Sequence, residues 1–311
     1  MSTRVGFIGL GHMGAPMCAQ VLRAGFAVTA FDLRADALTV ARASGATIAG
    51  SAAECASGAE VLITMLPGPA EVEAVLLGAG GVLAALGAGA IVADMSTSSP
   101  LLGRRIAAGA AQREVGFVDA PVADAKRAAE GRLQIMVGGD ACDVDRARPV
   151  LAAMGGADGV THVGPVGSGY TIKLLVNLQW FVHAVAAAEA FAVGLRAGID
   201  ARTLHDVFVS GPARSSFLEH EALEVLEDGE YAERFPLRLV SKDLALAIDL
   251  AHETGVPVEI SALTERVYER ARQRFGDREG ELGAVKLYEE LAGMPFRFVA
   301  EPGPNGAAEA G

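Results

Sequence analysis

A glycine-rich turn near the N-terminus constrains the fold more than any other feature of this chain. The apolar run 4–9, RVGFIG, has the length of a strand, and a helix is expected from about His12 to Ala24, ended by Gly25. The turn between them consists of Gly9, Leu10, Gly11, His12, Met13 and Gly14. Glycines at this spacing let the backbone approach a pyrophosphate, and the free N–H groups of the helix N-terminus attract that anion. The turn therefore predicts a dinucleotide-binding domain.

An acidic residue at the end of the next strand-like run supports a dinucleotide site. The run 26–31, FAVTAF, leads to Asp32, which follows Gly14 by 18 residues. A carboxylate here accepts hydrogen bonds from a ribose diol and repels a 2′-phosphate, so Asp32 favours NAD over NADP. Arg34 keeps NADP open as the less favoured cofactor. The cofactor residues expected at this turn are Asp32, Leu33 and Arg34.

Strand-length apolar runs alternate with helical segments up to about residue 163. After the first two, these runs cover 47–49, 61–65, 90–93, 115–118 and 133–137. Such alternation predicts βαβ units, and therefore an α/β domain, 1–163, with a doubly wound parallel sheet of the Rossmann type. Ser51 and Glu54 have the spacing of a capping box, which starts a helix between two of these runs.

The second part of the chain has a different character. Residues 170–197 are apolar and rich in alanine, which predicts one buried helix about 42 Å long within a linking segment, 164–197. Gly198 is expected to end this helix, and Asp200 to cap the next one. An all-α domain for substrate binding and dimerisation, 198–297, is expected to hold helices at about 201–209, 215–228, 240–254, 260–275 and 280–292. The tail 298–311 is expected to lack fixed structure.

Composition and charge exclude several classes of protein. With 51% hydrophobic residues, the chain is too apolar to be disordered throughout. A net charge of −12 argues against a nucleic-acid binder and against docking on anionic membranes. The three cysteines and six histidines have no disulfide or metal-ligand spacing, so we expect no metal and a reducing cytoplasm. The N-terminus lacks the pattern of a signal peptide, so none is expected. No transmembrane helix is expected either, because His183, Glu189 and Arg196 interrupt the longest apolar segment.

Two further turns follow strand-like runs, at the edge of a parallel sheet where ligands bind. Met65, Leu66 and Pro67 form the first turn and are expected to contact the cofactor, although alone they suit an ordinary turn equally well. Ser96 and Thr97 form the second, and their hydroxyl and N–H groups are expected to hold a substrate carboxylate or the nicotinamide ribose. The alternative for this second pair is a helix cap.

A cation stands on the long apolar helix. Gly169, Lys173 and Asn177 are spaced four residues apart and share one helix face. A buried lysine is costly unless it has a partner or a lowered pKa, and a lowered pKa suits a general acid/base. We expect Gly169 to let substrate or cofactor approach the helix, Lys173 to exchange the proton and Asn177 to orient a hydroxyl. The alternative is a lysine that extends to solvent. Lys242, next to the expected N-cap Ser241, suits a ligand better than a helix N-terminus.

Together these segments resemble the β-hydroxyacid dehydrogenase family, which includes 3-hydroxyisobutyrate dehydrogenases and tartronate semialdehyde reductases, over about residues 4–295. The resemblance rests on VGFIGLGHMGAPM, ITMLP, DMST, VDAPVADA, GPVGSGYTIKLLVN and SKDLALA. It implies hydride transfer between nicotinamide and a carbon that bears a hydroxyl or carbonyl, with Lys173 as general acid/base and Lys242 as a cofactor contact. Related imine reductases usually lack this lysine, so its presence favours alcohol and aldehyde chemistry.

One segment departs from the family pattern. Where the family usually has a serine and two glycines that hold the substrate carboxylate, this chain has Ala123, Asp124 and Ala125. An aspartate beside a bound carboxylate is repulsive. The substrate is therefore expected to bear an amine, or to place its anion near Lys126, Arg127 or Arg214. Alternatively, Asp124 points to solvent and only backbone N–H groups of the segment bind.

The sequence thus predicts an NAD(P)-dependent oxidoreductase that interconverts a 3-hydroxy acid, or a related substituted alcohol, and its aldehyde or ketone. Its site is expected in the cleft between the two domains, and the apolar helical half suggests a homodimer or higher homo-oligomer. Two alternatives stay open. One is an imine reductase of the same fold, which would tolerate the loss of Lys173, and the other is a non-catalytic dinucleotide-binding scaffold.

Overall fold

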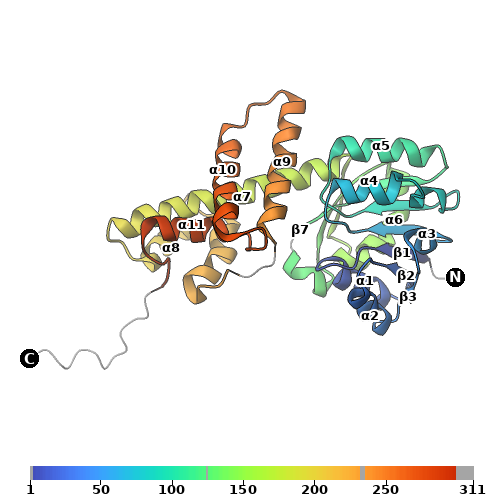
Figure 1. Cartoon of the computed structure of the whole chain (residues 1–311), viewed down its shortest axis with the longest axis horizontal. Helices are drawn as coiled ribbons and strands as arrows, with labels where there is room; N and C mark the ends of the chain where they lie inside the picture. Colours follow the sequence, from blue (N-terminus) through green and yellow to red (C-terminus); the bar gives the residue numbers. More distant parts are fainter. Residues whose placement is uncertain (1–2, 124, 232–234, 299–311) are drawn as a thin grey trace, which may run out of the picture. The chain divides into compact units, whose positions relative to one another are not determined.

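The computed structural model describes residues 3–123, 125–231 and 235–298. They form two compact units, the first ending at Leu175 and the second beginning at Val176. This boundary lies inside helix α7 (Ser168–Arg196), so both units contain part of that helix. Figure 1 labels the α-helices of both units and the strands β1, β2, β3 and β7. The end of the first domain predicted from the sequence lies earlier, at residue 163.

The first unit is built on a sheet that has nine strands among the described residues. The strands are β1 (Arg4–Ile8), β2 (Ala27–Phe31), β3 (Thr47–Ile48), β4 (Val61–Thr64), β5 (Ile91–Asp94), β6 (Gly116–Asp119), β7 (Val122–Ala123), β8 (Gln134–Gly138) and β9 (Val160–Gly164). They follow the order β3-β2-β1-β4-β5-β6-β8-β7, and β9 pairs with β8. All neighbours from β3 to β6 are parallel, which confirms the doubly wound sheet.

Beyond β6, the sheet differs from the prediction of an all-parallel arrangement. Strand β8 runs antiparallel to both β6 and β7. The cause is the connection, because the chain returns from β6 through a short strand and the 3-10 helix η2 (Ala125–Glu130) rather than through a helical crossover. Strand β9 is missing from the sequence prediction, since its residues Thr161 and His162 are exposed and break the apolar pattern.

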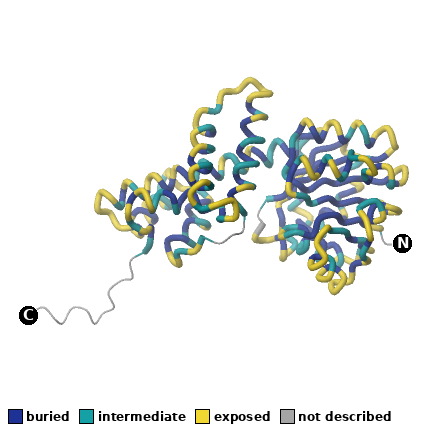
Figure 2. The backbone as a smooth tube through the Cα atoms, in the orientation of Figure 1, coloured by how far each residue is buried: buried dark blue, intermediate teal, exposed yellow. Residues whose placement is uncertain are grey.

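Helices cover both faces of this sheet. They are α1 (Gly14–Arg23), α2 (Ala35–Ala43), α3 (Ala52–Ala56), α4 (Pro69–Leu77), α5 (Pro100–Ala111) and α6 (Ala141–Gly155). Successive residues of a strand enter different cores. In β4, Ile63 packs with residues of α1 and α6, whereas its neighbour Leu62 packs with residues of α4 and α5. The central strands are therefore buried on both faces, as Figure 2 shows in dark blue.

The described part of the second unit is helical, with one isolated β-bridge between Pro236 and Gly280. Its elements after α7 are α8 (Ala201–Ser210), the π-helical turns η3 (Phe217–Glu221) and η4 (Glu224–Asp228), α9 (Leu237–Thr254), α10 (Glu259–Phe275) and α11 (Gly283–Ala292). Asp200 caps α8 as expected, accepting the N–H of Thr203 at 2.9 Å. The expected cap at Ser241 is wrong, because α9 begins one turn earlier and Ser241 lies inside it.

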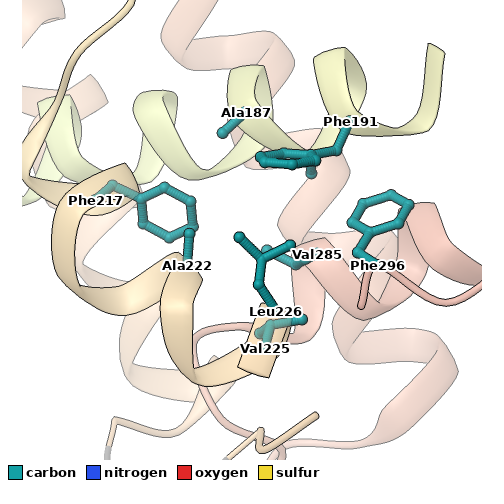
Figure 3. A pocket seen from close by; sticks show the side chains of 9 residues that line it. Ala187, Phe191, Phe217, Ala222, Val225, Leu226, Val285 and Phe296 are labelled. Carbon is teal, nitrogen blue, oxygen red and sulfur yellow. The ribbon is translucent and has the colours of Figure 1, made fainter. Parts of the chain in front are cut away.

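Helix α7 is long and apolar enough, by length and composition, to cross a membrane. Its apolar side chains have a different explanation here. Phe181 and Val185 pack against α9 and α10, while Ala188 and Phe191 pack against η3, η4 and α11. Figure 3 shows a small cavity beside Phe191, about 10 Å³ in volume and lined by apolar side chains alone. That volume is at the lower limit for one water molecule, so the cavity is a packing gap rather than a ligand site.

Of the expected tail 298–311, only Phe298 lies within the described residues. Its N–H donates to the carbonyl oxygen of Leu226 at 2.7 Å, and the guanidinium of Arg202 lies 4.1 Å from the centre of its ring. Phe298 is thus part of the helical unit. Residues 299–311 lie outside the described part of the chain.

Candidate functional site

The three glycines of the first turn have different surroundings. A Cβ at Gly9, whose φ is +95°, would lie 2.2 Å from the carbonyl oxygen of Met65, and one at Gly14 would lie 1.9 Å from that of Gly9. A Cβ at Gly11 would meet no heavy atom within 4 Å. Gly9 and Gly14 therefore let β1, α1 and the next turn pack closely, whereas Gly11 leaves open space for a ligand to approach the backbone.

The N-terminus of α1 has the properties of an anion site. Its N-cap, Met13, makes no capping hydrogen bond with its side chain, and the first turn of the helix carries no acidic residue. The N-terminal N–H groups and the positive end of the helix dipole are thus not neutralised by a side chain of this turn. Together with the open side of Gly11, this arrangement fits the pyrophosphate of a dinucleotide. His12 is exposed at the same turn, and Leu10 is buried beneath it.

Asp32 connects the glycine turn to the end of β2. One carboxylate oxygen accepts the N–H of Leu10 at 2.6 Å, and the other accepts the N–H of Arg34 at 2.8 Å. The guanidinium of Arg34 lies 3.4 Å from Asp32 and also donates to the carbonyl oxygen of Leu10 at 3.1 Å. Leu33 between them is 92% exposed. The structure therefore brings these three expected cofactor residues together with the glycine turn.

The two other turns expected at this sheet edge are joined by Ser96. Its hydroxyl accepts the N–H of Leu66 at 2.9 Å and donates to Asp94 at 2.7 Å. Ser96 is fully buried, so in this structure its hydroxyl holds the two turns together instead of facing an open site. The helix cap belongs to Ser99, which accepts the N–H of Leu102 at the start of α5. Met65, Leu66 and Thr97 are half-buried, and Pro67 is exposed.

Two buried carboxylates, which the sequence analysis did not select, lie at the ends of adjacent strands. Asp94 ends β5 and pairs in register with Asp119 at the end of β6. Burial raises the pKa of both carboxyls, and that of Asp119 reaches about 7. Asp94 accepts hydrogen bonds from the hydroxyls of Thr64, at 2.5 Å, and of Tyr170. The signal in the sequence was an aspartate at the end of each apolar run, in IVAD and GFVD.

In this structure the space beside Gly169 is occupied by backbone atoms, so its expected role beside a ligand stays a prediction. A Cβ at Gly169 would lie 2.4 Å from the carbonyl oxygen of Met136 and 2.6 Å from that of Asp119. The glycine is needed because α7 packs closely against the ends of β6 and β8, and a ligand does not fill this space. Lys173 follows one turn later, half-buried, and therefore leaves the helix on the side that adjoins these strand ends.

In the second unit, Asn177 and Lys242 share one partner. The side-chain amide of Asn177 donates to Asp243 at 2.6 Å, and Lys242 Nζ lies 2.9 Å from the other carboxylate oxygen. Asp243 is 1% exposed. It was not among the expected site residues, and it lies inside α9, which begins six residues earlier.

The segment that departs from the family pattern is described only in part. Ala123 is half-buried at the end of β7, while Asp124 and the side chain of Ala125 lie outside the described residues. Lys126 and Arg127 are exposed on η2. Arg214, in the second unit, pairs with Glu219 at 2.7 Å. Among the described residues, no three His, Cys, Asp or Glu side chains gather into a metal site.

Two family profiles and several curated relatives match this chain. Residues 4–164 match the profile of the NAD binding domain of 6-phosphogluconate dehydrogenase, and residues 167–288 match that of the NAD-binding domain of NADP-dependent 3-hydroxyisobutyrate dehydrogenase. The NAD-dependent L-serine dehydrogenase of Pseudomonas aeruginosa is 36% identical over 94% of this chain and 99% of its own length. The 2-(hydroxymethyl)glutarate dehydrogenase of Eubacterium barkeri is 33% identical over 94% and 97%.

Solved structures that resemble this chain include members of the same family of dehydrogenases. Mycobacterium tuberculosis 3-hydroxyisobutyrate dehydrogenase with L-serine is 32% identical, with a TM-score of 0.83 over 92% of this chain and 99% of that one. Imine reductases share the fold at 17–19% identity, which is too distant to indicate their activity. The chain belongs to the β-hydroxyacid dehydrogenase family of the 3-hydroxyisobutyrate dehydrogenase type and is an NAD(P)-dependent hydroxyacid dehydrogenase.

Proposed function

We propose that this enzyme oxidises a small 3-hydroxy acid that carries an amino group, with L-serine as the first candidate, and that Lys173 is its general acid/base. The observation that carries the proposal is the position of Lys173 at the start of α7. The first turn of this helix is hydrogen-bonded to the ends of β5 and β6, at the same edge of the sheet as the glycine turn. Ligands of doubly wound sheets bind at this edge.

In this proposal, the reaction divides between a proton and a hydride. NAD, held by the glycine turn and Asp32, would supply the hydride acceptor for the carbon that bears the hydroxyl. Lys173, in its neutral form, takes the hydroxyl proton, and in the reverse direction returns it to the carbonyl oxygen. Asn177 donates its amide hydrogen to Asp243, which leaves its carbonyl oxygen to accept a hydrogen bond from the substrate hydroxyl.

The proposal of an amino group rests on the segment that departs from the family pattern. Asp124 stands where the family usually has a small residue, and a carboxylate there attracts an ammonium group. A 36% identical relative is named for L-serine, and a 32% identical one has been solved with it. The competing substrate is a plain 3-hydroxy acid, whose carboxylate would pair with Lys126 or Arg127 of η2.

We propose NAD as the preferred cofactor. Asp32 has further lone pairs for a ribose diol besides those that accept the N–H groups of Leu10 and Arg34. A 2′-phosphate beside this carboxylate would be repelled. NADP remains the competing cofactor, because Arg34 stands beside the same site and a 27% identical relative has been solved with NADP+.

The expected homodimer and cytoplasmic location also stay proposals. Exposed apolar side chains on the helical unit, such as Val193 and Val207, supply surface that a second copy would cover. Light scattering of the purified protein at micromolar concentration tests this, and a mass of about 32 kDa would contradict the dimer.

Absorbance of the reduced nicotinamide tests the reaction. The enzyme is assayed with NAD and with NADP against L-serine, D-serine, 3-hydroxyisobutyrate and a cyclic imine, beside Lys173→Ala and Lys173→Arg. We expect oxidation of L-serine that both variants lose, since arginine keeps the charge but does not exchange a proton near neutral pH. Activity on 3-hydroxyisobutyrate alone would remove the amino group from the proposal. Imine turnover that survives Lys173→Ala would favour an imine reductase, and cofactor binding without any turnover would favour a scaffold.

A further inference from the structure

Asp94 is a buried junction between three segments of the candidate site. Its carboxylate accepts hydrogen bonds from three hydroxyl groups. They belong to Thr64 at the end of β4, Ser96 in the turn after β5 and Tyr170 in the first turn of α7. The hydroxyl of Ser96, which donates to Asp94, in turn accepts a hydrogen bond from the N–H of Leu66. The turn expected to contact the cofactor, the turn expected to contact substrate and the helix that carries Lys173 are thus joined by one side chain.

The first turn of α7 is held from outside the helix. The N–H groups of Gly167 and Tyr170 donate to the two carboxylate oxygens of Asp119, at 2.7 and 2.9 Å. Asp119 therefore supplies the cap that a serine or aspartate at the helix start would usually provide. Because Asp94 and Asp119 lie side by side on β5 and β6, the sheet fixes both attachment points of the helix.

Tyr170 fits its place through a matching glycine. A Cβ at Gly103 of α5 would lie 2.8 Å from the ring of Tyr170, so a larger residue at 103 would push the ring away. Tyr170 is fully buried, and burial together with the negative charge of Asp94 raises the pKa of its hydroxyl well above 10. The hydroxyl therefore stays protonated and donates a hydrogen bond to Asp94. Lys173 follows Tyr170 by three residues, within one helical turn.

We propose that Asp94, acting through Tyr170, is a positioning residue that holds Lys173 in register with the cofactor turn. The proposal rests on the general acid/base role given to Lys173 above. A buried carboxylate is an expensive way to make an ordinary helix contact, since an apolar pair would serve the packing without desolvating a charge. Three hydroxyl donors on one carboxylate instead fix direction as well as distance, which proton transfer requires.

The decisive variant is Tyr170→Phe, which keeps the ring on Gly103 and removes the hydrogen bond to Asp94. Tyr268→Phe is the matched control, because Tyr268 is also fully buried and its hydroxyl has no hydrogen-bond partner among the described residues. We expect Tyr170→Phe to lower kcat about ten- to a hundredfold, since a displacement of about 1 Å at a catalytic group costs that much. The Kd for NAD should change by less than about threefold, because Ser96 still holds Leu66. Tyr268→Phe should leave kcat and Kd unchanged.

A second pair of measurements keeps the proposal falsifiable where Tyr170→Phe folds poorly. Asp94→Asn has one acceptor oxygen and an NH₂ group in place of two acceptors, so it disturbs both turns, and both kcat and the Kd for NAD should worsen. Hydrogen exchange of the amides at 168–173 should speed up in either variant relative to Tyr268→Phe. Wild-type kcat in a folded Tyr170→Phe, or in Asp94→Asn, overturns the positioning role. Lys173→Ala, assayed in parallel, separates the two proposals: if it keeps full activity, the role of Lys173 fails first, whatever Tyr170→Phe does.

Discussion

The side-chain amide of Asn177 donates to a carboxylate oxygen of Asp243 at 2.6 Å, although the two residues are 66 positions apart in the sequence. This hydrogen bond engages the NH₂ group of the Asn177 amide rather than its carbonyl oxygen. With the NH₂ group on Asp243, the carbonyl oxygen of Asn177 is left to face a donor, which suits a substrate hydroxyl. Lys242 lies on the other oxygen of the same carboxylate, so one buried acid fixes both a proposed substrate contact and a proposed cofactor contact.

This arrangement predicts different effects for two substitutions of Asp243. Asp243→Ala frees both neighbours, and kcat/KM should fall by about tenfold or more, since a hydrogen bond to a charged group contributes about 1.5–3 kcal/mol. Asp243→Asn can still accept from Asn177 but loses the charge beside Lys242, so the KM for NAD should rise more than kcat falls. Asp249→Asn, an exposed acid on the same helix, is the control and should behave as wild type. Equal kinetics for Asp243→Ala and Asp249→Asn would show that the bond has no role in turnover.

A second prediction separates folding from cofactor binding at the glycine turn. Gly14→Ala places a methyl group 1.9 Å from the carbonyl oxygen of Gly9, and overpacking of this kind should lower the free energy of unfolding by about 1–3 kcal/mol. Gly11→Ala meets open space, so its unfolding in urea should match wild type. The methyl group would instead stand where the pyrophosphate approaches, and titration of NAD should show a Kd raised by about tenfold or more. Unchanged NAD affinity in Gly11→Ala would place the pyrophosphate elsewhere.

The local parts of the fold were predictable from the sequence because they depend on neighbours along the chain. The glycine turn, the acid at Asp32 and the cap at Asp200 are patterns of a few residues, and the structure contains all three. The start of α9 was misjudged, because the helix begins at Leu237, four residues before the expected cap Ser241. Strand β9 lacks an apolar pattern and is stabilised by pairing with β8, which no local pattern shows.

The buried carboxylates were out of reach of the sequence for a different reason. Asp94 and Asp119 matter because β5 and β6 are neighbours in register, and strand order is a property of the whole sheet. Gly169 was assigned to a ligand because a glycine on a helix signals a close approach, but the sequence does not say which partner approaches. Here the partner is the backbone at the ends of β6 and β8.

A third prediction concerns the choice between NAD and NADP. Asp32→Ser removes the charge that repels a 2′-phosphate and also frees the guanidinium of Arg34, which now lies 3.4 Å from Asp32. The ratio of kcat/KM for NAD to that for NADP should therefore fall by about tenfold or more, equal to about 1.4 kcal/mol. The double variant Asp32→Ser/Arg34→Ala should lose the gain with NADP. An unchanged ratio in Asp32→Ser would mean that this carboxylate does not face the ribose.

The last prediction follows from the raised pKa of Asp119. Burial moves this pKa from the usual 3.8 to about 7, although the N–H groups of Gly167 and Tyr170 act in the opposite direction. Between these two values the folded protein keeps a proton that the unfolded chain has lost. Where the folded state binds more protons than the unfolded chain, the free energy of unfolding decreases as the pH rises. Asp119 therefore destabilises the fold increasingly from about pH 4 to about pH 7. The full effect is at most about 4 kcal/mol.

Asp119→Asn isolates this contribution, because an amide of the same shape does not titrate. The free energy of unfolding in urea is measured for both proteins at intervals from pH 5 to pH 8.5. The variant loses one of the two acceptors for the N–H groups at the start of α7, so it should be less stable than wild type at pH 5. The difference in free energy of unfolding between the variant and wild type should shrink as the pH approaches 7 and stay constant above it. The reason is that only wild type acquires a buried charge at this position as the pH rises. Parallel pH profiles for the two proteins would mean that Asp119 is ionised throughout and that its hydrogen bonds outweigh its burial.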